Sequence, residues 1–365
     1  MVICGTDLFS SILPYVHVLS SSSLLSTSTY CSQCLILSTD LKRCSKCHQI
    51  SYCSISCQRQ DWIYHKYECI HLHTITDEYD LTRLFLRLII RYKNDNGIEN
   101  SSTKRCLNDL KTHENEIRHD KRRYTIFQLI YQRLKQWNLF DQLDELIIFQ
   151  QFCRLIINTL TIHDTIDLKC IGYGLYFNAT IYNHSCSPTC HTVFNGIYLS
   201  IRTLCDESSE EWTINYIDLL ESYKNRQDYL RENYYFNCQC KRCLKNDKNE
   251  LILLEKIRYN EQQMDKFIDK NEFNNAYEIS KNLSDYYNEI LPYYHAYVSL
   301  HHVKHLKLEL YLAETISNLI LQSTIKNTCQ RVQISMGEKH PLTQEAINLC
   351  EHYKLEMTMK QKQIK

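Results

Sequence analysis

The chain has little glycine or proline, no net charge and no long apolar run. It contains 6 glycines and 4 prolines in 365 residues, and its 42 Lys and Arg balance its 42 Asp and Glu. Without a global basic field, the composition does not favour a nucleic-acid partner. No run of about 18 apolar residues and no signal-peptide pattern is present, so we expect a soluble intracellular protein. At about 150 residues per domain, the length predicts two or three domains.

Cysteine, in contrast, is abundant, with 19 in the chain. In a reducing compartment, cysteines at short regular spacings are more often metal ligands than disulfide partners. Residues 31–69 hold four such pairs: Cys31 and Cys34, Cys44 and Cys47, Cys53 and Cys57, and His65 and Cys69. Eight ligands are the number that two tetrahedral zinc ions need. A segment this short buries too little core to fold alone, so we expect metal binding to fold it.

The remaining patterns separate strands from helices. Apolar residues at helical spacing predict a helix over 81–92, and short β-branched and aromatic runs predict a small antiparallel sheet within 145–220. Asn195-Gly196 between two of these runs predicts a β-hairpin. After residue 245 the pattern is helical, with one helix expected over Leu306–Gln322. We therefore predict an α-helical C-terminal domain, plausibly built of two-helix repeats.

A second cysteine group follows the stretch IYNHSCSPTC (Ile181 to Cys190). Its members are Cys238, Cys240 and Cys243. Three thiolates leave a tetrahedral zinc one ligand short, and Cys186 would complete the site, with Cys190 as the rival fourth ligand. A nucleophilic pair of Cys186 and His184 is less favoured, because two residues apart on a strand does not assure their hydrogen bond and no cysteine-hydrolase signature is present.

These motifs carry a family resemblance. GYGLYFNATIYNHSCSPTC, EEWTINYIDLL and YYFNCQCKRC resemble the catalytic half of a SET domain with its post-SET segment, and CQRQDWIYHKYEC, with its Trp62, resembles the end of a MYND zinc finger. This combination is similar to the SMYD family of protein-lysine methyltransferases. The resemblance implies an α+β fold: a SET-domain β-core of small antiparallel sheets, an inserted MYND zinc finger, a helical SET insert, a post-SET zinc segment and an α-helical, TPR-like C-terminal domain. The implied boundaries are 1–30 for an N-terminal SET remnant, 31–69 for the MYND finger, 70–160 for the helical linker and SET insert, 161–220 for the SET core, 221–245 for the post-SET segment and 246–365 for the C-terminal domain.

The resemblance also implies site residues. In MYND fingers the pairs interleave, which implies one zinc on Cys31, Cys34, Cys53 and Cys57 and another on Cys44, Cys47, His65 and Cys69. A third zinc is implied on Cys186, Cys238, Cys240 and Cys243. The implied cofactor is S-adenosylmethionine, and the residues that match its contacts are Asn183, His184, Phe236, His113 and Asn158. Tyr216 matches the catalytic tyrosine of the family.

The implied function is S-adenosylmethionine-dependent methylation of lysine in histone or other proteins, by in-line displacement in a tyrosine-lined channel. The alternative is a catalytically impaired SET pseudoenzyme that acts as a MYND and helical-repeat adaptor. The expected partners are a protein or peptide with the target lysine and a proline-containing peptide on the finger, without membrane or direct nucleic-acid binding. A DNA-binding zinc protein is disfavoured by the neutral charge and the lack of a basic recognition helix. Cytoplasmic and nuclear residence is the family expectation.

Two features depart from the family pattern. Family members begin with a Gly-x-Gly segment that holds the cofactor, whereas Gly5 is the first glycine here and the next is Gly97. We therefore expect an N-terminally truncated chain or a cofactor pocket that lacks one wall. The stretch ISMGEKHPLTQEAINLCEHY resembles the final helical repeat of the family, but too few repeats precede it, so we expect a shorter C-terminal domain and a more open substrate groove.

Overall fold

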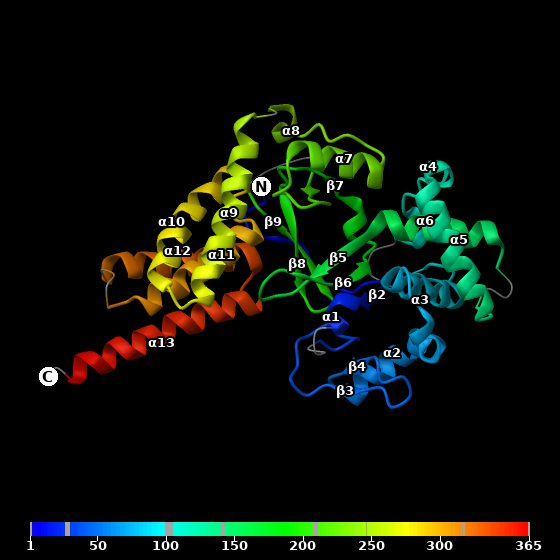
Figure 1. Ribbon diagram of the computed structural model, residues 1–365, viewed down its shortest axis with the longest axis horizontal. Coiled ribbons are helices and arrows are strands. Elements are labelled where there is room, and N and C mark those ends of the chain that lie inside the picture. Colours follow the sequence, from blue (N-terminus) through cyan, green and yellow to red (C-terminus); the bar gives the residue numbers. More distant parts are fainter. Residues whose placement is uncertain are drawn as a thin grey trace.

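The computed structural model has an α+β architecture, which confirms the predicted fold class. It describes residues 2–25, 30–98, 105–139, 143–206, 211–245, 247–314, 316 and 318–363. Small sheets lie at the centre, with one group of helices on each side (Figure 1). Among the described residues, no helix is both long and apolar enough to cross a membrane.

The strands of the described residues form four small sheets. The strands are β1 (Asp7–Ile12), β2 (Val16–Leu19), β3 (Lys42–Arg43), β4 (Ser51–Tyr52), β5 (Thr159–His163), β6 (Cys170–Leu175), β7 (Asn183–His184), β8 (Cys190–Asn195), β9 (Tyr198–Thr203) and β10 (Thr213–Ile214). Their orders are β1-β9-β8, β2-β6-β5, β10-β7 and β3-β4. The first two strands of the chain thus pair with strands that follow about 150 residues later or more, so residues 7–19 belong to the central sheets.

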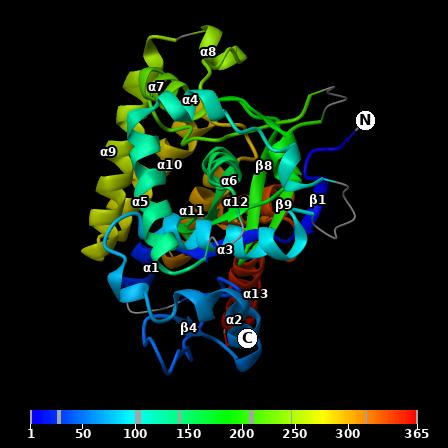
Figure 2. The same cartoon turned by 90° about the vertical axis from the view of Figure 1, so that its right-hand side faces the viewer.

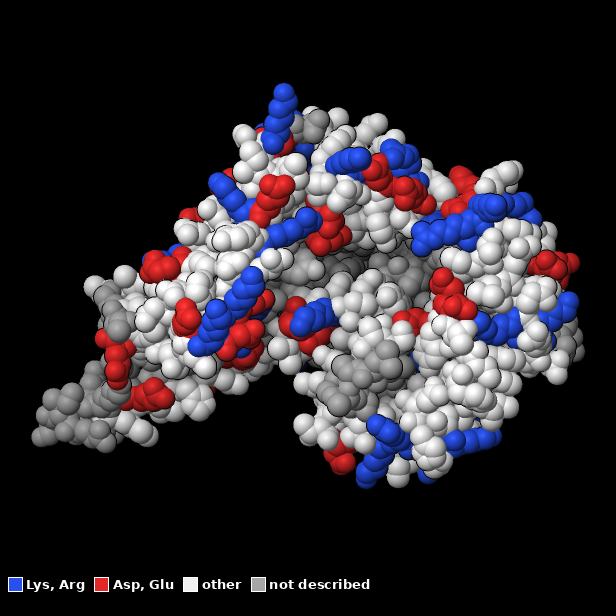
Figure 3. All heavy atoms as spheres, in the orientation of Figure 1, with Lys and Arg blue, Asp and Glu red and all other residues white. Residues whose placement is uncertain are grey.

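The helices cover both sides of these sheets. They are α1 (Ser21–Leu25), α2 (Ile55–Glu68), α3 (Tyr79–Asp95), α4 (Glu114–His119), α5 (Lys121–Gln136), α6 (Glu145–Asn158), α7 (Tyr223–Tyr234), α8 (Lys241–Lys245), α9 (Asn249–Asp269), α10 (Phe273–Ile290), α11 (Ala296–Tyr311), α12 (Asn318–Met336) and α13 (Pro341–Gln363). Figures 1 and 2 place the segment that contains β3, β4 and α2 below α3. Basic and acidic side chains are interspersed over the face in Figure 3.

Three sequence predictions need correction. The sheet region starts at Thr159, because residues 145–158 form α6. The β7–β10 pair is parallel, since β10 returns to β7 through a long connection rather than a hairpin. The helix expected over Leu306–Gln322 is broken, because α11 ends at Tyr311 and α12 begins at Asn318.

Burial explains this break. Leu306 and Leu321 are both fully buried in the same apolar cluster, whereas in a single helix they would lie about 22 Å apart. The chain therefore reverses between them, and α12 packs beside α11. Helices α10 to α13 each pack on the helix before, as the prediction of a helical C-terminal domain requires.

The end of α12 fastens the C-terminal domain to the β8–β9 hairpin. Arg202 Nε donates to the carbonyl oxygen of Ile334 at 2.7 Å, and His191 Nε2 lies 2.9 Å from that of Ser335. His340 Nε2 lies 3.1 Å from the carbonyl oxygen of Phe194. Because the last carbonyls of a helix lack intrahelical partners, Arg202 and His191 cap α12 while they hold it against the sheet.

The turn between β8 and β9 also holds the cysteine-rich segment, residues 31–69, through a backbone hydrogen bond. The predicted hairpin is present, but its two-residue loop is Gly196-Ile197, since Asn195 still pairs with Tyr198. Gly196 has φ +58°, and a Cβ on it would lie 2.3 Å from the carbonyl oxygen of Cys34. The same oxygen accepts a hydrogen bond from Ile197 N at 3.1 Å. This turn therefore has no room for a side chain at residue 196.

Gly196→Ala should destabilise the protein by about 2–5 kcal/mol, because a left-handed conformation costs roughly 1–2 kcal/mol and overpacking roughly 1–3 kcal/mol. Denaturant unfolding measures the loss. Gly337→Ala is the matched control, since Gly337 also has a positive φ, +91°, but its nearest neighbour is an Arg202 side-chain atom at 3.4 Å. An equal loss in the two variants would contradict the clash with Cys34.

Candidate metal centres and active site

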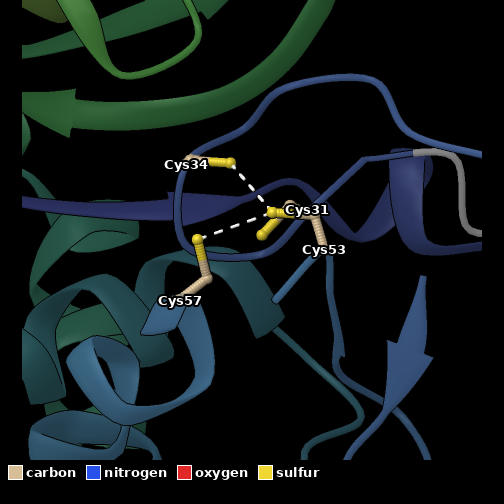
Figure 4. Close-up of side chains that lie close together, drawn as sticks. All are labelled: Cys31, Cys34, Cys53 and Cys57. Atoms are coloured by element: carbon tan, nitrogen blue, oxygen red, sulfur yellow. Dashed lines mark hydrogen bonds between the residues drawn. The ribbon is translucent and has the colours of Figure 1, made fainter. Parts of the chain in front are cut away.

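The first group of thiols comes from two separate parts of the chain. Its members are Cys31, Cys34, Cys53 and Cys57, whose sulfurs all lie within 4.8 Å of one another. Figure 4 shows the four side chains pointing toward one another. The Sγ–Sγ distance is 3.8 Å from Cys34 to Cys53 and 3.6 Å from Cys53 to Cys57. A tetrahedral zinc with Zn–S distances of about 2.3 Å requires sulfurs about 3.8 Å apart, so this group fits the ion.

The second group has the donor set of a Cys3His site. Its members are Cys44, Cys47, His65 and Cys69. The sulfurs of Cys44 and Cys69 are 3.9 Å apart, and Cys47 Sγ lies 3.5 Å from His65 Nε2. Pairs one and three thus form one group and pairs two and four the other, in the interleaved order that the resemblance implied.

A buried charge network supports His65 from behind. Its Nδ1 lies 3.3 Å from Glu68 Oε1, and Glu68 also pairs with Arg83 at 2.9 Å and with Arg87 at 3.0 Å. Arg87 in turn pairs with Asp61 at 2.7 Å. Each of these ion-pair side chains is at most 1% exposed. Burial alone would raise the pKa of Glu68, but Arg83 and Arg87 hold it well below its ordinary value.

This arrangement is the usual support of a metal-bound histidine, a carboxylate that fixes the orientation of the ring. The ligand spacing in the sequence does not predict this network. The only signal for it in the sequence is that Arg83 and Arg87 lie four residues apart in helix α3, where the adjacent buried residues are mostly apolar. Two buried arginines on one helix face require buried carboxylates opposite them.

The third group joins the stretch IYNHSCSPTC to the later cysteines. Its members are Cys186, Cys238, Cys240 and Cys243. The sulfur of Cys186 lies 3.9 Å from that of Cys238 and 3.5 Å from that of Cys243. Cys190, the rival fourth ligand, lies instead in β8, in the apolar core of the sheets. The structure therefore brings Cys186, and not Cys190, to this group.

Two arginines lie against this third group. Arg226 is 1% exposed, and its Nε and Nη2 have no oxygen or nitrogen partner. Burial opposes its charge, but Glu250 and Cys186 more than offset burial and raise the pKa of Arg226. Arg242 Nη1 donates to the carbonyl oxygen of Cys186 at 3.2 Å. Four thiolates on one Zn2+ carry two negative charges, so these cations fit a zinc-loaded group.

His184 connects the third group to Tyr216. His184 Nδ1 accepts a hydrogen bond from the Tyr216 amide at 3.0 Å, so Nε2 carries the proton and donates to Cys186 Sγ at 3.3 Å. The Tyr216 hydroxyl donates to the carbonyl oxygen of Tyr182 at 2.5 Å. Burial raises the pKa of Tyr216 to about 12, so its hydroxyl is protonated at neutral pH. Both the backbone and the ring of Tyr216 are thus held in place.

Three consecutive aromatic residues at the end of α7 meet three predicted site residues. The pairs of ring centroids are Tyr234 and Tyr216 at 5.1 Å, Tyr235 and His113 at 5.3 Å, and Phe236 and His184 at 6.1 Å. Tyr235 has a left-handed conformation, with φ +61°, which turns the chain at the end of the helix. Of these three, only Phe236 is predicted from the sequence, because nothing in the spacing indicates which way each ring points.

The other two predicted cofactor residues have polar partners within the protein. Asn183 Nδ2 donates to Glu211 Oε1 at 2.9 Å, and Asn158 Nδ2 donates to the carbonyl oxygen of Lys111 at 2.9 Å. Lys111 is two residues before His113, so Asn158 and His113 belong to one neighbourhood. The roles of these residues stay predictions.

A cavity of about 1040 Å³ opens beside Tyr216. Residues of β5 and β8, of α7 and of the start of α11 line it. Tyr216 and Tyr234 lie in its wall, whereas the five predicted cofactor residues do not. Figure 3 shows the molecule hollowed between the C-terminal helices and the helices on the opposite side. A half-buried tyrosine therefore faces a space large enough for a side chain of another molecule.

Comparisons with known proteins support both the metal-binding segment and the similarity to lysine methyltransferases. Residues 31–69 match the family model of the MYND finger. The chain is 35% identical over 231 residues to human histone-lysine N-methyltransferase SMYD3, which covers 61% of this chain and 53% of SMYD3. It is 29% identical over 224 residues to zebrafish N-lysine methyltransferase SMYD2-A, which covers 60% of this chain and 51% of SMYD2-A.

The chain spans about half the length of these relatives. The similarity extends well beyond the 39 residues of the finger, since cattle SMYD2 matches over 251 residues at 28% identity. The MYND finger and the extended similarity to SMYD3 and SMYD2 thus support the resemblance to the SMYD family.

Proposed function

We propose that the chain is an S-adenosylmethionine-dependent protein-lysine N-methyltransferase. The observation that carries the proposal is Tyr216, which lies in the wall of the cavity and is fixed by Tyr182 and His184. The relatives that bear the names of lysine methyltransferases support the same reaction and a protein substrate.

The chemistry suits these residues. S-adenosylmethionine supplies an activated methyl group, and its transfer to an amine is an in-line displacement that depends mainly on positioning. The lysine amine must lose its proton, although its ordinary pKa is about 10.4. The rings of Tyr216 and Tyr234 favour the neutral amine, because an apolar wall disfavours a buried ammonium. The protonated hydroxyl of Tyr216 orients the amine rather than removing its proton.

The cofactor would be held by the residues that the family resemblance assigns. These are Asn183, His184, Phe236, His113 and Asn158. Both ring nitrogens of His184 have protein partners, so we assign its cofactor contact to the backbone. Tyr235 lies beside His113 and Phe236 lies beside His184. Their rings are therefore surfaces on which adenine could stack.

Isothermal titration calorimetry of the zinc-loaded chain with S-adenosylmethionine tests this proposal, followed by transfer of a labelled methyl group to protein substrates. We expect saturable binding with one molecule per chain and label on lysine. A folded, zinc-loaded protein that binds no cofactor would overturn the enzymatic proposal for this chain.

That outcome would favour the adaptor, in which the finger and the helical domain bind proteins and the SET core is a scaffold. The hydrogen bond between Asn183 and Glu211 is the observation in its favour, because it occupies an amide that the cofactor would need. We propose protein or peptide partners in both cases, including a proline-containing peptide on the finger, with residence in cytoplasm and nucleus.

We also propose that the three cysteine groups hold three zinc ions. Metal analysis of the native protein should give about three zinc per chain, and Cys240→Ser should remove one, because a hydroxyl is a poor ligand for zinc. Cys190→Ala is the control, since Cys190 lies outside the group, and it should retain all three. A count of two in the unmutated protein would contradict the third site.

A further inference from the structure

Two cysteines outside the metal groups lie in contact in the C-terminal domain. Cys329 is on α12 and Cys350 is on α13, and their sulfurs are 3.1 Å apart. This distance is shorter than the 3.5–3.9 Å between sulfurs given above for the metal groups. Among the described residues, no third cysteine, histidine or carboxylate joins the two into a metal-binding group. The pair is therefore suited to thiol oxidation rather than to metal binding.

The two thiols differ in environment. Cys350 is 5% exposed, whereas Cys329 is half-buried and lies where two apolar clusters of the domain meet. A hydrogen bond from Cys350, helped by the charge of Lys354, lowers the pKa of Cys329 to about 7. Since the thiolate is the reactive form, Cys329 is the thiol that attacks an oxidant. Cys350 is then in place as the resolving thiol.

We propose that Cys329 and Cys350 form a reversible disulfide that joins α12 to α13, with hydrogen peroxide as the oxidant. The Cys329 thiolate takes one oxygen from peroxide and becomes a sulfenic acid, while the second oxygen leaves as hydroxide and is protonated to water. The Cys350 sulfur then attacks the sulfenic sulfur, and a second water leaves. Two thiols and one peroxide thus give one disulfide and two waters. A dithiol reductant reverses the reaction by exchange.

The position of the pair gives the disulfide a structural consequence. The end of α12 is fastened to the sheet through Ser335 and Ile334, and Met336 and His340 line the cavity beside Tyr216. A bond between α12 and α13 closes the loop that contains these residues. Oxidation therefore stiffens this wall of the cavity, a result that requires no assumption about which reaction the cavity supports.

The test treats the full, zinc-loaded chain with one equivalent of hydrogen peroxide, blocks the remaining thiols and maps its peptides without reduction. We expect a peptide pair that joins Cys329 to Cys350, two hydrogens lighter than the separate peptides and abolished by dithiothreitol. Hydrogen exchange of α12 and α13 should slow several-fold in the oxidised protein. Oxidation that releases zinc before the pair is joined would overturn the proposal, as would recovery of both thiols unmodified.

Two variants distinguish disulfide formation between Cys329 and Cys350 from oxidation of other thiols in the protein. In Cys350→Ser, the joined peptides should disappear, and Cys329 should stay at sulfenic acid with one equivalent of peroxide and proceed to sulfinic acid with a second equivalent, because its resolving thiol is gone. Cys153→Ser removes a buried cysteine on α6 and should leave the joined peptides unchanged. If Cys350→Ser still slows hydrogen exchange after peroxide treatment, the stiffening does not come from this disulfide.

Discussion

Glu68→Gln should destabilise the cysteine-rich segment by about 3–5 kcal/mol, the usual cost of leaving a buried charge without its partner. The carboxylate of Glu68 is shared by Arg83 and Arg87, and these side chains are fully buried. The amide preserves the volume but leaves two arginines with Asp61 as their one remaining anion in the network. The affinity of the His65 zinc should also fall by about 10–100-fold, because Glu68 orients the ring. Zinc release to a chromogenic chelator, followed against denaturant, measures both effects.

Two further variants test whether the loss of stability in Glu68→Gln comes from the unpaired buried arginines. Glu278→Gln removes an exposed carboxylate that pairs with Lys281 at the surface, and it should change stability by less than about 0.5 kcal/mol. Glu68→Gln combined with Arg83→Met leaves one buried cation and one buried anion, so it should recover part of the loss. Strictly additive losses would mean that Glu68 and Arg83 act independently, contrary to the structure.

The sequence indicates the three cysteine groups better than it indicates what surrounds them. Ligands two or three residues apart belong to one turn, so the pair Cys44 and Cys47 is visible in the chain itself. Which pairs share an ion depends on how distant segments meet, and the family resemblance alone supplied it. The ion pairs of Glu68 depend in the same way on how α2 crosses α3. Helical spacing shows that Arg83 and Arg87 share a face, but not what that face meets.

The same limit applies around Tyr216. Its motif identified the residue, and the stretch IYNHSCSPTC identified its neighbours. The sequence could not show that His184 lies between the Tyr216 amide and a cysteine of the third group. Nor could it show that Tyr235, with its left-handed backbone, directs Tyr234 and Phe236 toward different residues. Local conformation at one residue decides where three rings point, and a propensity scale does not contain that information.

Loss of a zinc ion from the third group should therefore weaken the hydrogen bond that holds the Tyr216 amide, because His184 links this amide to Cys186. Without its metal, Cys186 is a thiol rather than a thiolate, and it accepts a weaker hydrogen bond from His184 Nε2. The ring that fixes the Tyr216 amide is then less well held. A zinc ion in the third group would thus contribute to the geometry of the cavity wall, although none of the predicted metal ligands lines the cavity.

Tyr216→Phe should lower the rate of methyl transfer by about 10²–10³-fold, the usual loss when one positioned hydrogen-bonding group is removed from an active site. The ring, its contact with Tyr234 and the amide bond to His184 all remain, so the affinity for S-adenosylmethionine should change less than about threefold. Single-turnover methylation and calorimetry on the same preparations measure the two quantities.

The control is Tyr198→Phe, which removes the hydroxyl of a tyrosine that is 45% exposed on β9 and should leave the rate unchanged. Because the Tyr216 hydroxyl also donates to the carbonyl oxygen of Tyr182, its loss should cost about 1 kcal/mol of stability. A small loss of stability with a large loss of rate indicates a hydroxyl that acts on the substrate. If the rate stays within threefold of the unmutated protein, Tyr216 only supports the fold, and the catalytic role must belong to another group in the cavity.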